Sequence, residues 1–562
     1  MKRIFFLLSL CAFLFSCSKS VNNKVTYNIS QIVKDGIPYI KINMVFKPNS
    51  KKSTKLWFQN DAWGEKDIYN TIHKMNLLDQ KGLITKNKDS GWIEISHPSG
   101  TKQIHFEYFL KQDFKTDINA QNSYRPIIKK EYFHIFSHNM FMLPENLTSE
   151  NNKKFDVVLN WNDFPSDFII HNSFGSEQRV QELKDLTEEE FHSAIFVGGD
   201  FRIYSNDIKN NQLVLATRGD WIPFKDAEVF DLLYQTVKVQ RSFWKDHSQK
   251  YFTVTMMPFP QNEGSSFGGT GLTNSFATSI SNNDQSSIEQ LRYLFNHELM
   301  HNWIGHAIKN ENEEEQYWFS EGFTDYFTQK NIAKNKMLGS DTGDFINQMN
   351  ITIKNLYTSP VAVVPNSEIT YDNFWSNRDY EKLPYYRGSV FAFILDLKIK
   401  RGSNNKFSLD DVMRDLLQQS KNGIKLNSEV FIKSVNQFIS ENIDPFFEKH
   451  IVKGELYDLS TIFINHGIKF SSKAKVFDQG FSYDKQTKIV TDVVPNSSAY
   501  NAGLRSGDLL KGWSIYYGNI EKEIELKILK DAVEKIIIYL PVKDIDLPQL
   551  LINEENIKKM NL

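Results

Sequence analysis

Hydrophobic and polar residues alternate over much of the first third of the chain. The alternation is clearest at residues 25–29, 39–46, 102–108 and 155–161, and turn-forming residues separate these stretches. Alternation places every second side chain on the same face of a strand, so it predicts half-buried β-strands. We expect residues 17–165 to form an N-terminal β domain of the sandwich type.

Further along the chain the pattern changes to a helical period. Residues 166–285 mix short strand patterns with one amphipathic helix at 227–246. From residue 286 to residue 460, apolar positions recur mainly at helical spacing, and residues 470–562 return to short strands. The chain is therefore predicted to be a multidomain α+β protein. Its expected divisions after the β domain are residues 166–460 and residues 461–562.

A short histidine motif lies within one of the helical patterns. Residues 297–301 read His-Glu-Leu-Met-His, and Glu321 follows twenty positions after the second histidine, where a second helix is expected to begin at Ser320. On a helix, two histidines four residues apart project from one face and can bind the same metal ion. Two histidines and a carboxylate, with one coordination position left for water, are the ligands of a catalytic zinc site.

The residues around the motif place it in a buried helix. The five-residue motif can arise by chance, but an apolar stripe at helical spacing runs through it. This stripe consists of Ile288, Leu291, Leu294, Phe295, Leu299 and Ile304. Unpaired histidine and glutamate side chains are costly inside such a helix, and a bound metal removes that cost. We predict one zinc ion per chain, bound by His297, His301 and Glu321.

A glycine-rich segment precedes the histidine helix. It can be a plain turn, or an exposed edge strand along which the backbone of a substrate lies, because glycine permits a close approach. In the second case the residues that contact the substrate are Gly268, Gly269, Gly271 and Thr273. The segment lacks the form of a phosphate-binding loop.

The first residues of the chain predict export. Met-Lys-Arg is followed by an almost wholly apolar run from Ile4 to Phe15, which is too short to span a bilayer and is typical of a secretory signal. The run ends in Leu-Phe-Ser-Cys, which resembles the bacterial lipobox. Cys11 is removed with the signal, so Cys17 is left without a disulfide partner. Lipid attachment explains this unpaired cysteine.

These features predict where the protein is located. Residues 1–16 are expected to be a lipoprotein signal peptide, and Cys17 is expected to carry the lipid. The protein is then lipid-anchored in the bacterial cell envelope, with its folded domains outside the cytoplasm. Ser18, by resemblance to bacterial lipoproteins, favours the outer membrane. A formal net charge of −2 gives no argument for a nucleic-acid partner.

The motifs together resemble those of the gluzincin metallopeptidases, the thermolysin-like clan. His297 to Gly305 resembles the M1 aminopeptidases, which have one residue fewer between the second histidine and the glutamate. The rest is more similar to the M61 branch, the glycyl-aminopeptidase-like enzymes. The M61-like segments are 321–324, 385–388, 408–413 and 445–454, and residues 502–508 resemble the PDZ domain that M61 members carry.

This resemblance implies a zinc-dependent aminopeptidase with a thermolysin-like domain at 166–460 and a PDZ-like domain at 461–562. Glu298 is then the general base and later the general acid. Tyr385 donates a hydrogen bond to the oxyanion, with the adjacent Tyr386 as the alternative. Asp325 is a candidate hydrogen-bond acceptor for one of the histidines that bind the metal. The alternative is that Asp325 is only an acidic residue on the solvent-facing side of its helix.

Two departures from the family pattern keep other functions open. Both branches usually carry a glutamate in the glycine-rich strand, where it binds the substrate's free amine, but Thr273 stands near that place. Arg387 replaces the usual lysine of Tyr-x-Lys-Gly. The alternatives to an aminopeptidase are an endopeptidase without amine recognition and a non-catalytic peptide-binding lipoprotein with a structural metal. The expected partners are a peptide or protein substrate, the membrane and, unless the PDZ-like domain is only a packing module, its peptide ligand.

Overall fold

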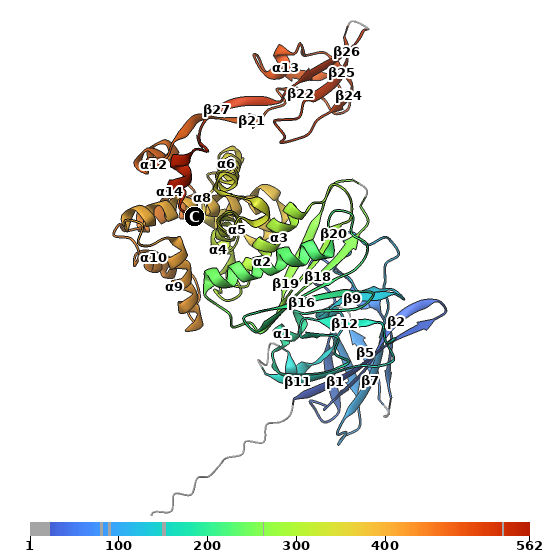
Figure 1. The fold of residues 1–562 in the computed structure, drawn as a ribbon. Helices are drawn as coiled ribbons and strands as arrows, with labels where there is room; N and C mark the ends of the chain where they lie inside the picture. Colours follow the sequence, from blue (N-terminus) through green and yellow to red (C-terminus); the bar gives the residue numbers. More distant parts are fainter. Residues whose placement is uncertain (1–22, 79–81, 88–90, 149–152, 262, 531–532) are drawn as a thin grey trace, which may run out of the picture. The chain divides into compact units, whose positions relative to one another are not determined.

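The structure is a computed structural model of the 562-residue chain. It describes residues 23–78, 82–87, 91–148, 153–261, 263–530 and 533–562. The expected signal peptide and Cys17 lie outside the described residues. No helix within these ranges is long and apolar enough to cross a membrane. The chain divides into two compact units, Met1–Phe230 with His247–Ser287 and Asp231–Asp246 with Ile288–Leu562 (Figure 1).

Three sheets form the N-terminal part of the first unit. The six-stranded sheet has the order β14-β11-β1-β2-β7-β4 and consists of β1 (Lys24–Lys34), β2 (Ile37–Phe46), β4 (Ile72–Leu77), β7 (Ile104–Leu110), β11 (Phe155–Trp161) and β14 (Val180–Leu186). The four-stranded sheet has the order β10-β3-β6-β5 and consists of β3 (Ser53–Trp57), β5 (Ile84–Asn87), β6 (Trp92–Ser96) and β10 (Leu143–Pro144). The five-stranded sheet has the order β13-β12-β15-β9-β8 and consists of β8 (Ile127–Ile128), β9 (Tyr132–Phe136), β12 (Ile169–Asn172), β13 (Gly175–Ser176) and β15 (Ile195–Gly199).

The alternating sequence pattern gives these strands one buried face. On β1 the buried side chains are Val25, Tyr27 and Ile29, and on the antiparallel β2 they include Ile42 and Met44. Removal of these side chains from water stabilises the sheet by roughly 25 cal/mol per Å² of apolar surface. The sheets continue past residue 165, because β14 pairs with β11 and β15 pairs with β9. Among the described residues of this part, α1 (Glu188–His192) is a short helix, and 3₁₀ turns lie at Ile68–Thr71, Ser137–Asn139 and Glu145–Leu147.

A fourth sheet completes the first unit and carries the glycine-rich segment. Its order is β16-β17-β18-β20-β19, and its strands are β16 (Arg202–Ile208), β17 (Asn211–Thr217), β18 (Tyr251–Phe259), β19 (Phe267–Leu272) and β20 (Ser275–Ser281). Helix α2 (Asp226–Trp244) lies between β17 and β18 in sequence. Among the described residues β19 pairs only with β20, so it is an edge strand.

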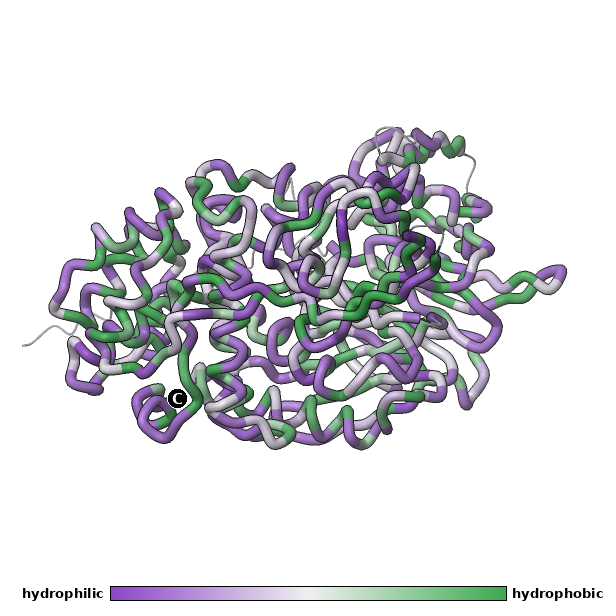
Figure 2. The backbone as a smooth tube through the Cα atoms, turned by 90° about the horizontal axis from the view of Figure 1, so that it is seen from above, coloured by the Kyte–Doolittle hydropathy of each residue, from purple (hydrophilic) through white to green (hydrophobic). Residues whose placement is uncertain are grey.

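Helices dominate the second unit up to residue 465. They are α3 (Ile288–Met300), α4 (Glu313–Ser320), α5 (Gly322–Lys334), α6 (Thr342–Thr358), α7 (Tyr371–Ser376), α8 (Arg378–Gly402), α9 (Leu409–Lys421), α10 (Ser428–Val435), α11 (Asp444–Phe447) and α12 (Leu459–Asn465). Short 3₁₀ turns lie at Met337–Gly339 and Asn366–Glu368, and a π-helical turn follows α11 at Glu448–Val452. Hydrophobic and hydrophilic residues alternate along the helices, as expected when each helix buries one face (Figure 2).

The C-terminal residues form strands with a core of their own. An antiparallel ribbon joins β21 (Phe470–Phe477) to β27 (Val542–Leu550), and α14 (Glu554–Met560) follows it. Between the ribbon strands lie β22 (Phe481–Tyr483), β23 (Val490–Val493), α13 (Ser498–Asn501), β24 (Leu509–Ser514), β25 (Ile524–Lys530) and β26 (Val533–Tyr539). Side chains from these elements form a hydrophobic cluster separate from that of the helices.

Candidate metal centre

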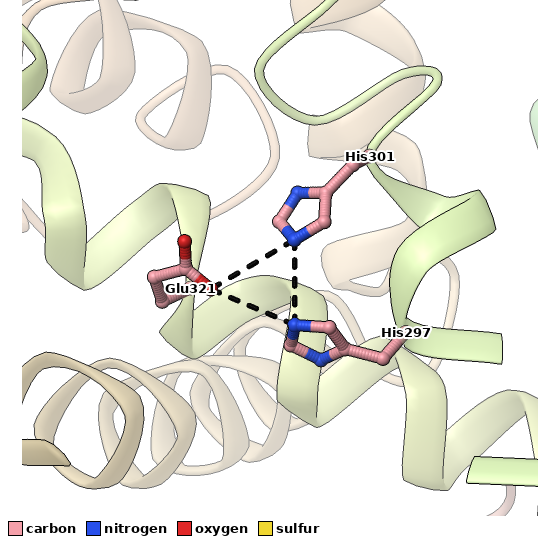
Figure 3. A group of neighbouring side chains, drawn as sticks. All are labelled: His297, His301 and Glu321. Atoms are coloured by element: carbon pink, nitrogen blue, oxygen red, sulfur yellow. Dashed lines mark hydrogen bonds and ion pairs between the residues drawn. The ribbon is translucent and has the colours of Figure 1, made fainter. Parts of the chain in front are cut away.

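The two histidines of the motif project from the end of α3. His297 lies in the last turn of the helix, and His301 is the first residue after it. Glu321 lies at the junction of α4 and α5, because α4 ends at Ser320 and α5 begins at Gly322. The expected helix start at Ser320 was therefore wrong. The three side chains point toward one another from these elements (Figure 3).

The distances between the three side chains match the size of a single metal site. Nε2 of His297 lies 3.3 Å from Nε2 of His301, and Oε2 of Glu321 lies 3.6 Å from the first and 3.8 Å from the second. Ligand atoms bound at 2.0–2.1 Å in a tetrahedron lie about 3.4 Å apart. Histidine, cysteine, aspartate and glutamate are the side chains that commonly bind metal ions. Within the described ranges, the group of three such residues whose ligand atoms lie close enough for one ion is His297, His301 and Glu321.

The hydrogen bonding of the ligands also fits a cation. Oε2 of Glu321 is buried and has no hydrogen-bond partner among the described atoms, which is costly for a carboxylate oxygen. Nδ1 of His301 lies 3.1 Å from the carbonyl oxygen of Ile304, an acceptor that requires the ring proton on Nδ1. Nε2 of His301 then carries a lone pair that faces the other two ligands. The residues present therefore fit a zinc ion.

The electrostatics of the site attract positive charge. Burial is the largest influence on His297 and lowers its pKa, but interactions with Asp325, Glu321 and Glu298 outweigh burial and raise that pKa to about 10. Burial raises the pKa of Glu321, but the interactions with the nearby His297 and His301 outweigh burial and lower that pKa to about 2. The raised pKa of His297 reflects the three carboxylates around it, and a metal ion would balance their charge. The lowered pKa of Glu321 shows that its carboxylate stays ionised beside the two imidazoles.

Asp325 and Tyr293 contact His297 away from the ring nitrogen that faces the other two ligands. Oδ1 of Asp325 lies 3.5 Å from Nδ1 of His297, and the Tyr293 hydroxyl donates a hydrogen bond to the same Asp325 oxygen. The Tyr293 ring also stacks on the His297 ring at 5.7 Å between centroids. A carboxylate at this position of a ligand histidine orients the ring and increases its basicity. The sequence reasoning missed Tyr293, although its position one turn before His297 on the same helix face could have revealed it.

Glu298 lies next to the metal ligands and is available for proton transfer. Its side chain is half-buried, and it makes no ion pair or hydrogen bond with other described residues. Its charge helps to raise the pKa of both His297 and Tyr385. A carboxylate in this position can accept a proton from a water between the ligands.

The adjacent tyrosines Tyr385 and Tyr386 differ in their contacts with the candidate metal ligands. The Tyr385 ring stacks on His297 at 5.9 Å between centroids and an interplanar angle of 16°. Burial raises the pKa of the Tyr385 hydroxyl far above its usual value, and the charges of Glu321 and Glu298 raise it further, so the hydroxyl stays a proton donor. Tyr386 is half-buried, and within the described residues its ring does not stack on His297 or His301. Of the two tyrosines, Tyr385 is therefore the one that contacts a candidate metal ligand.

Arg387 has a structural role, because it binds backbone carbonyl groups. Its guanidinium is buried, and Nη2 donates to the carbonyl oxygens of Ala362 at 3.2 Å and Val364 at 2.6 Å. Burial lowers its pKa to about 10. The side chain thus fixes the segment between α6 and α7.

Two glycines bring the ligand-bearing junction against α8. A Cβ added to Gly388 would lie 1.9 Å from the carbonyl oxygen of Trp318, and one added to Gly322 would lie 2.4 Å from Cα of Gly388. Only glycine allows this approach. It places the junction that carries Glu321 directly against the helix that carries Tyr385.

The expected substrate strand belongs to the first unit, whereas the metal ligands belong to the second. Gly268, Gly269 and Gly271 lie on the edge strand β19, and Thr273 follows its end. A Cβ at Gly269 would lie 2.3 Å from the Phe276 ring, so packing within the sheet requires that glycine. A Cβ at Gly268 would make only an ordinary contact, 4.0 Å from the carbonyl oxygen of Ser279. No acidic side chain lies on β19.

Comparison with known proteins agrees with this site. Residues 249–450 match the model of the peptidase family M1 domain. No curated protein sequence matches the chain. An aminopeptidase N family protein from Idiomarina loihiensis has a similar fold, with a TM-score of 0.69, 15% identity, and coverage of 95% of this chain and 99% of that one. The domain match and the fold support a gluzincin-type, M1-like peptidase.

Replacement of Asp325 by asparagine should weaken zinc binding by about 10- to 100-fold, because His297 loses the carboxylate that orients its ring. Competition of the purified protein with a chelator measures this affinity. The control is Asp372→Asn, an exposed acid on α7, which should leave zinc affinity unchanged. Equal zinc affinities of the parent and the Asp325 variant would contradict the assignment.

Proposed function

We propose that the protein is a zinc-dependent peptidase of the M61-like aminopeptidase type. The observation that carries this proposal is the triangle of His297, His301 and Glu321 with the unpaired carboxylate of Glu298 beside it. Zinc, when bound, would lower the pKa of its water and polarise the scissile carbonyl group. A structural metal site has no need of an adjacent base, so this arrangement speaks against the peptide-binding lipoprotein.

The side chains of the chain itself would carry out the proton transfers. Glu298 would take the proton of the attacking water and then deliver it to the leaving amine. The Tyr385 hydroxyl would donate a hydrogen bond to the oxyanion that forms at the carbonyl oxygen. Asp325 and Tyr293 would keep His297 in place during the reaction.

The first test is replacement of Glu298 by glutamine. The variant should bind zinc as the parent does but lose kcat by roughly 10²- to 10⁴-fold, the usual contribution of a general base. Zinc content and peptide hydrolysis are measured on the same preparation. Glu289→Gln, an exposed change in the first turn of the same helix, is the matched control and should keep full activity. A Glu298 variant that retains zinc and cleaves as fast as the parent would overturn the catalytic assignment.

The type of peptidase depends on recognition of the substrate's amino group. The absence of an acid on β19 motivates the alternative, an endopeptidase. An aminopeptidase should cleave a peptide with a free amino end about 100-fold faster, in kcat/KM, than its N-acetylated form, because acetylation removes one charge-assisted hydrogen bond. Equal rates on the two peptides would rule out recognition of the free amine and favour the endopeptidase.

We also propose that Cys17 is lipid-modified and anchors the protein in the cell envelope, with the outer membrane as the favoured site. The apolar run before Cys17 and the lack of a disulfide partner support this. The mature protein should begin at Cys17 with a mass increased by the attached acyl chains. Cys17→Ser should move the protein out of the membrane fraction. A mass spectrum with an unmodified Cys17 would refute the anchor.

A further inference from the structure

A cavity of about 560 Å³ lies within the second unit, away from the metal ligands. Residues at the C-terminal ends of α8, α12 and α14 line it, and none of the residues assigned to the metal centre does. The volume falls within the range of small-molecule sites, about 300–1,000 Å³. We call this cavity the basic pocket.

The side chains of the basic pocket carry one sign of charge. Its cationic residues are Lys400, Arg401, Lys558 and Lys559, and no aspartate or glutamate is among its lining residues. Asn404, Asn405, Asn465 and Asn561 add amide donors and acceptors, and the buried Leu397 and Ile468 give an apolar floor. Such a combination of cations, amides and limited apolar surface suits a small anionic molecule with further polar groups.

Two of the four cations satisfy groups of the protein itself. Helix C-termini carry partial negative charge on unpaired carbonyl oxygens. Lys400 Nζ donates to the carbonyl oxygens of Met560 at 2.8 Å and Asn561 at 3.1 Å, and it pairs with Asp396 at 3.0 Å. Lys559 donates to the carbonyl oxygen of Gly467 and pairs with Glu555. These two lysines therefore offset the partial negative charge at the helix C-termini.

Arg401 and Lys558 remain available for a ligand. Both are exposed, and neither side chain makes an ion pair or a hydrogen bond with any other part of the chain that the structure describes. Their charges are not needed for the helix ends, because Lys400 and Lys559 already bind those carbonyl groups. The guanidinium of an arginine matches the spacing of two oxygens of a phosphate group, and a lysine adds a point charge.

We propose that the basic pocket binds a small phosphate ester through Arg401 and Lys558, with the asparagine amides contacting the polar remainder of the ligand. The shared chemistry is the phosphate oxyanion, and its source is either a soluble phosphate ester or the headgroup of an anionic phospholipid. This site is independent of the proposed peptidase reaction.

Isothermal titration of the full-length protein with inorganic phosphate at low salt tests the site. The parent should give saturable binding, and Arg401→Gln combined with Lys558→Gln should weaken it at least 10-fold. Lys425→Gln with Lys433→Gln removes the same charge from exposed positions outside the pocket and should change the affinity less than 2-fold. Arg401→Lys with Lys558→Arg keeps both charges and should retain most of the binding.

Three results would overturn the proposal: no saturable binding to the parent, an equal loss of affinity in the pocket and control variants, or unchanged binding in the pocket variant. Peptide hydrolysis by the pocket variant should equal that of the parent, so failure here is separable from failure of the proposed function. Glucose 6-phosphate against glucose, and phosphatidylglycerol vesicles against phosphatidylcholine vesicles, distinguish the two sources. In either case the pocket variant should weaken the binding at least 10-fold.

Discussion

The candidate metal centre depends on the close backbone contact between α8 and the junction of α4 and α5. His297 and His301 lie four residues apart, in the last turn of α3 and directly after it, so their spacing is local. Glu321 and Tyr385 come from elements far apart in sequence and meet the histidines only if α8 lies against the junction. Gly322 and Gly388 make that approach possible, because a Cβ at either position would overlap with backbone atoms.

A buried charge network holds the other end of the same helix pair. Lys330 of α5 binds Asp396 of α8 at 3.0 Å and Asp410 at the start of α9 at 2.7 Å. Tyr326, also on α5, donates to Asp396 at 2.7 Å. A buried charge is tolerated when opposite charges and hydrogen bonds surround it, and these partners fix one relative position of the helices. Glycines near Glu321 and charges near Lys330 thus hold α5 on α8 at both ends.

The sequence predicted the parts of this site that local chemistry determines. The histidine pair follows from the helical period alone, and the glutamate follows from its neighbours in the motif. The alternating stretches predicted strands such as β1 and β2, because a two-residue period needs no knowledge of the partner strand. The helix boundary at Glu321 was missed, because the residue lies between two helices whose junction is set by packing on α8. Tyr293 was missed because its role depends on Asp325, a residue on another helix.

The same distinction explains why Tyr385 and Tyr386 could not be separated from sequence. Adjacent residues on a helix point about 100° apart, so only one can face the histidines, and the choice depends on how α8 is rotated about its axis. That rotation is fixed by Gly388, whose missing side chain must face Trp318. Gly388 lies three residues after Tyr385 and two after Tyr386, and residues three apart share a helix face whereas residues two apart do not. The glycine of the Tyr-Tyr-Arg-Gly segment therefore places Tyr385, and not Tyr386, on the helix face beside His297, so the constraint that brings Glu321 to α8 also positions the tyrosine that we propose as the donor.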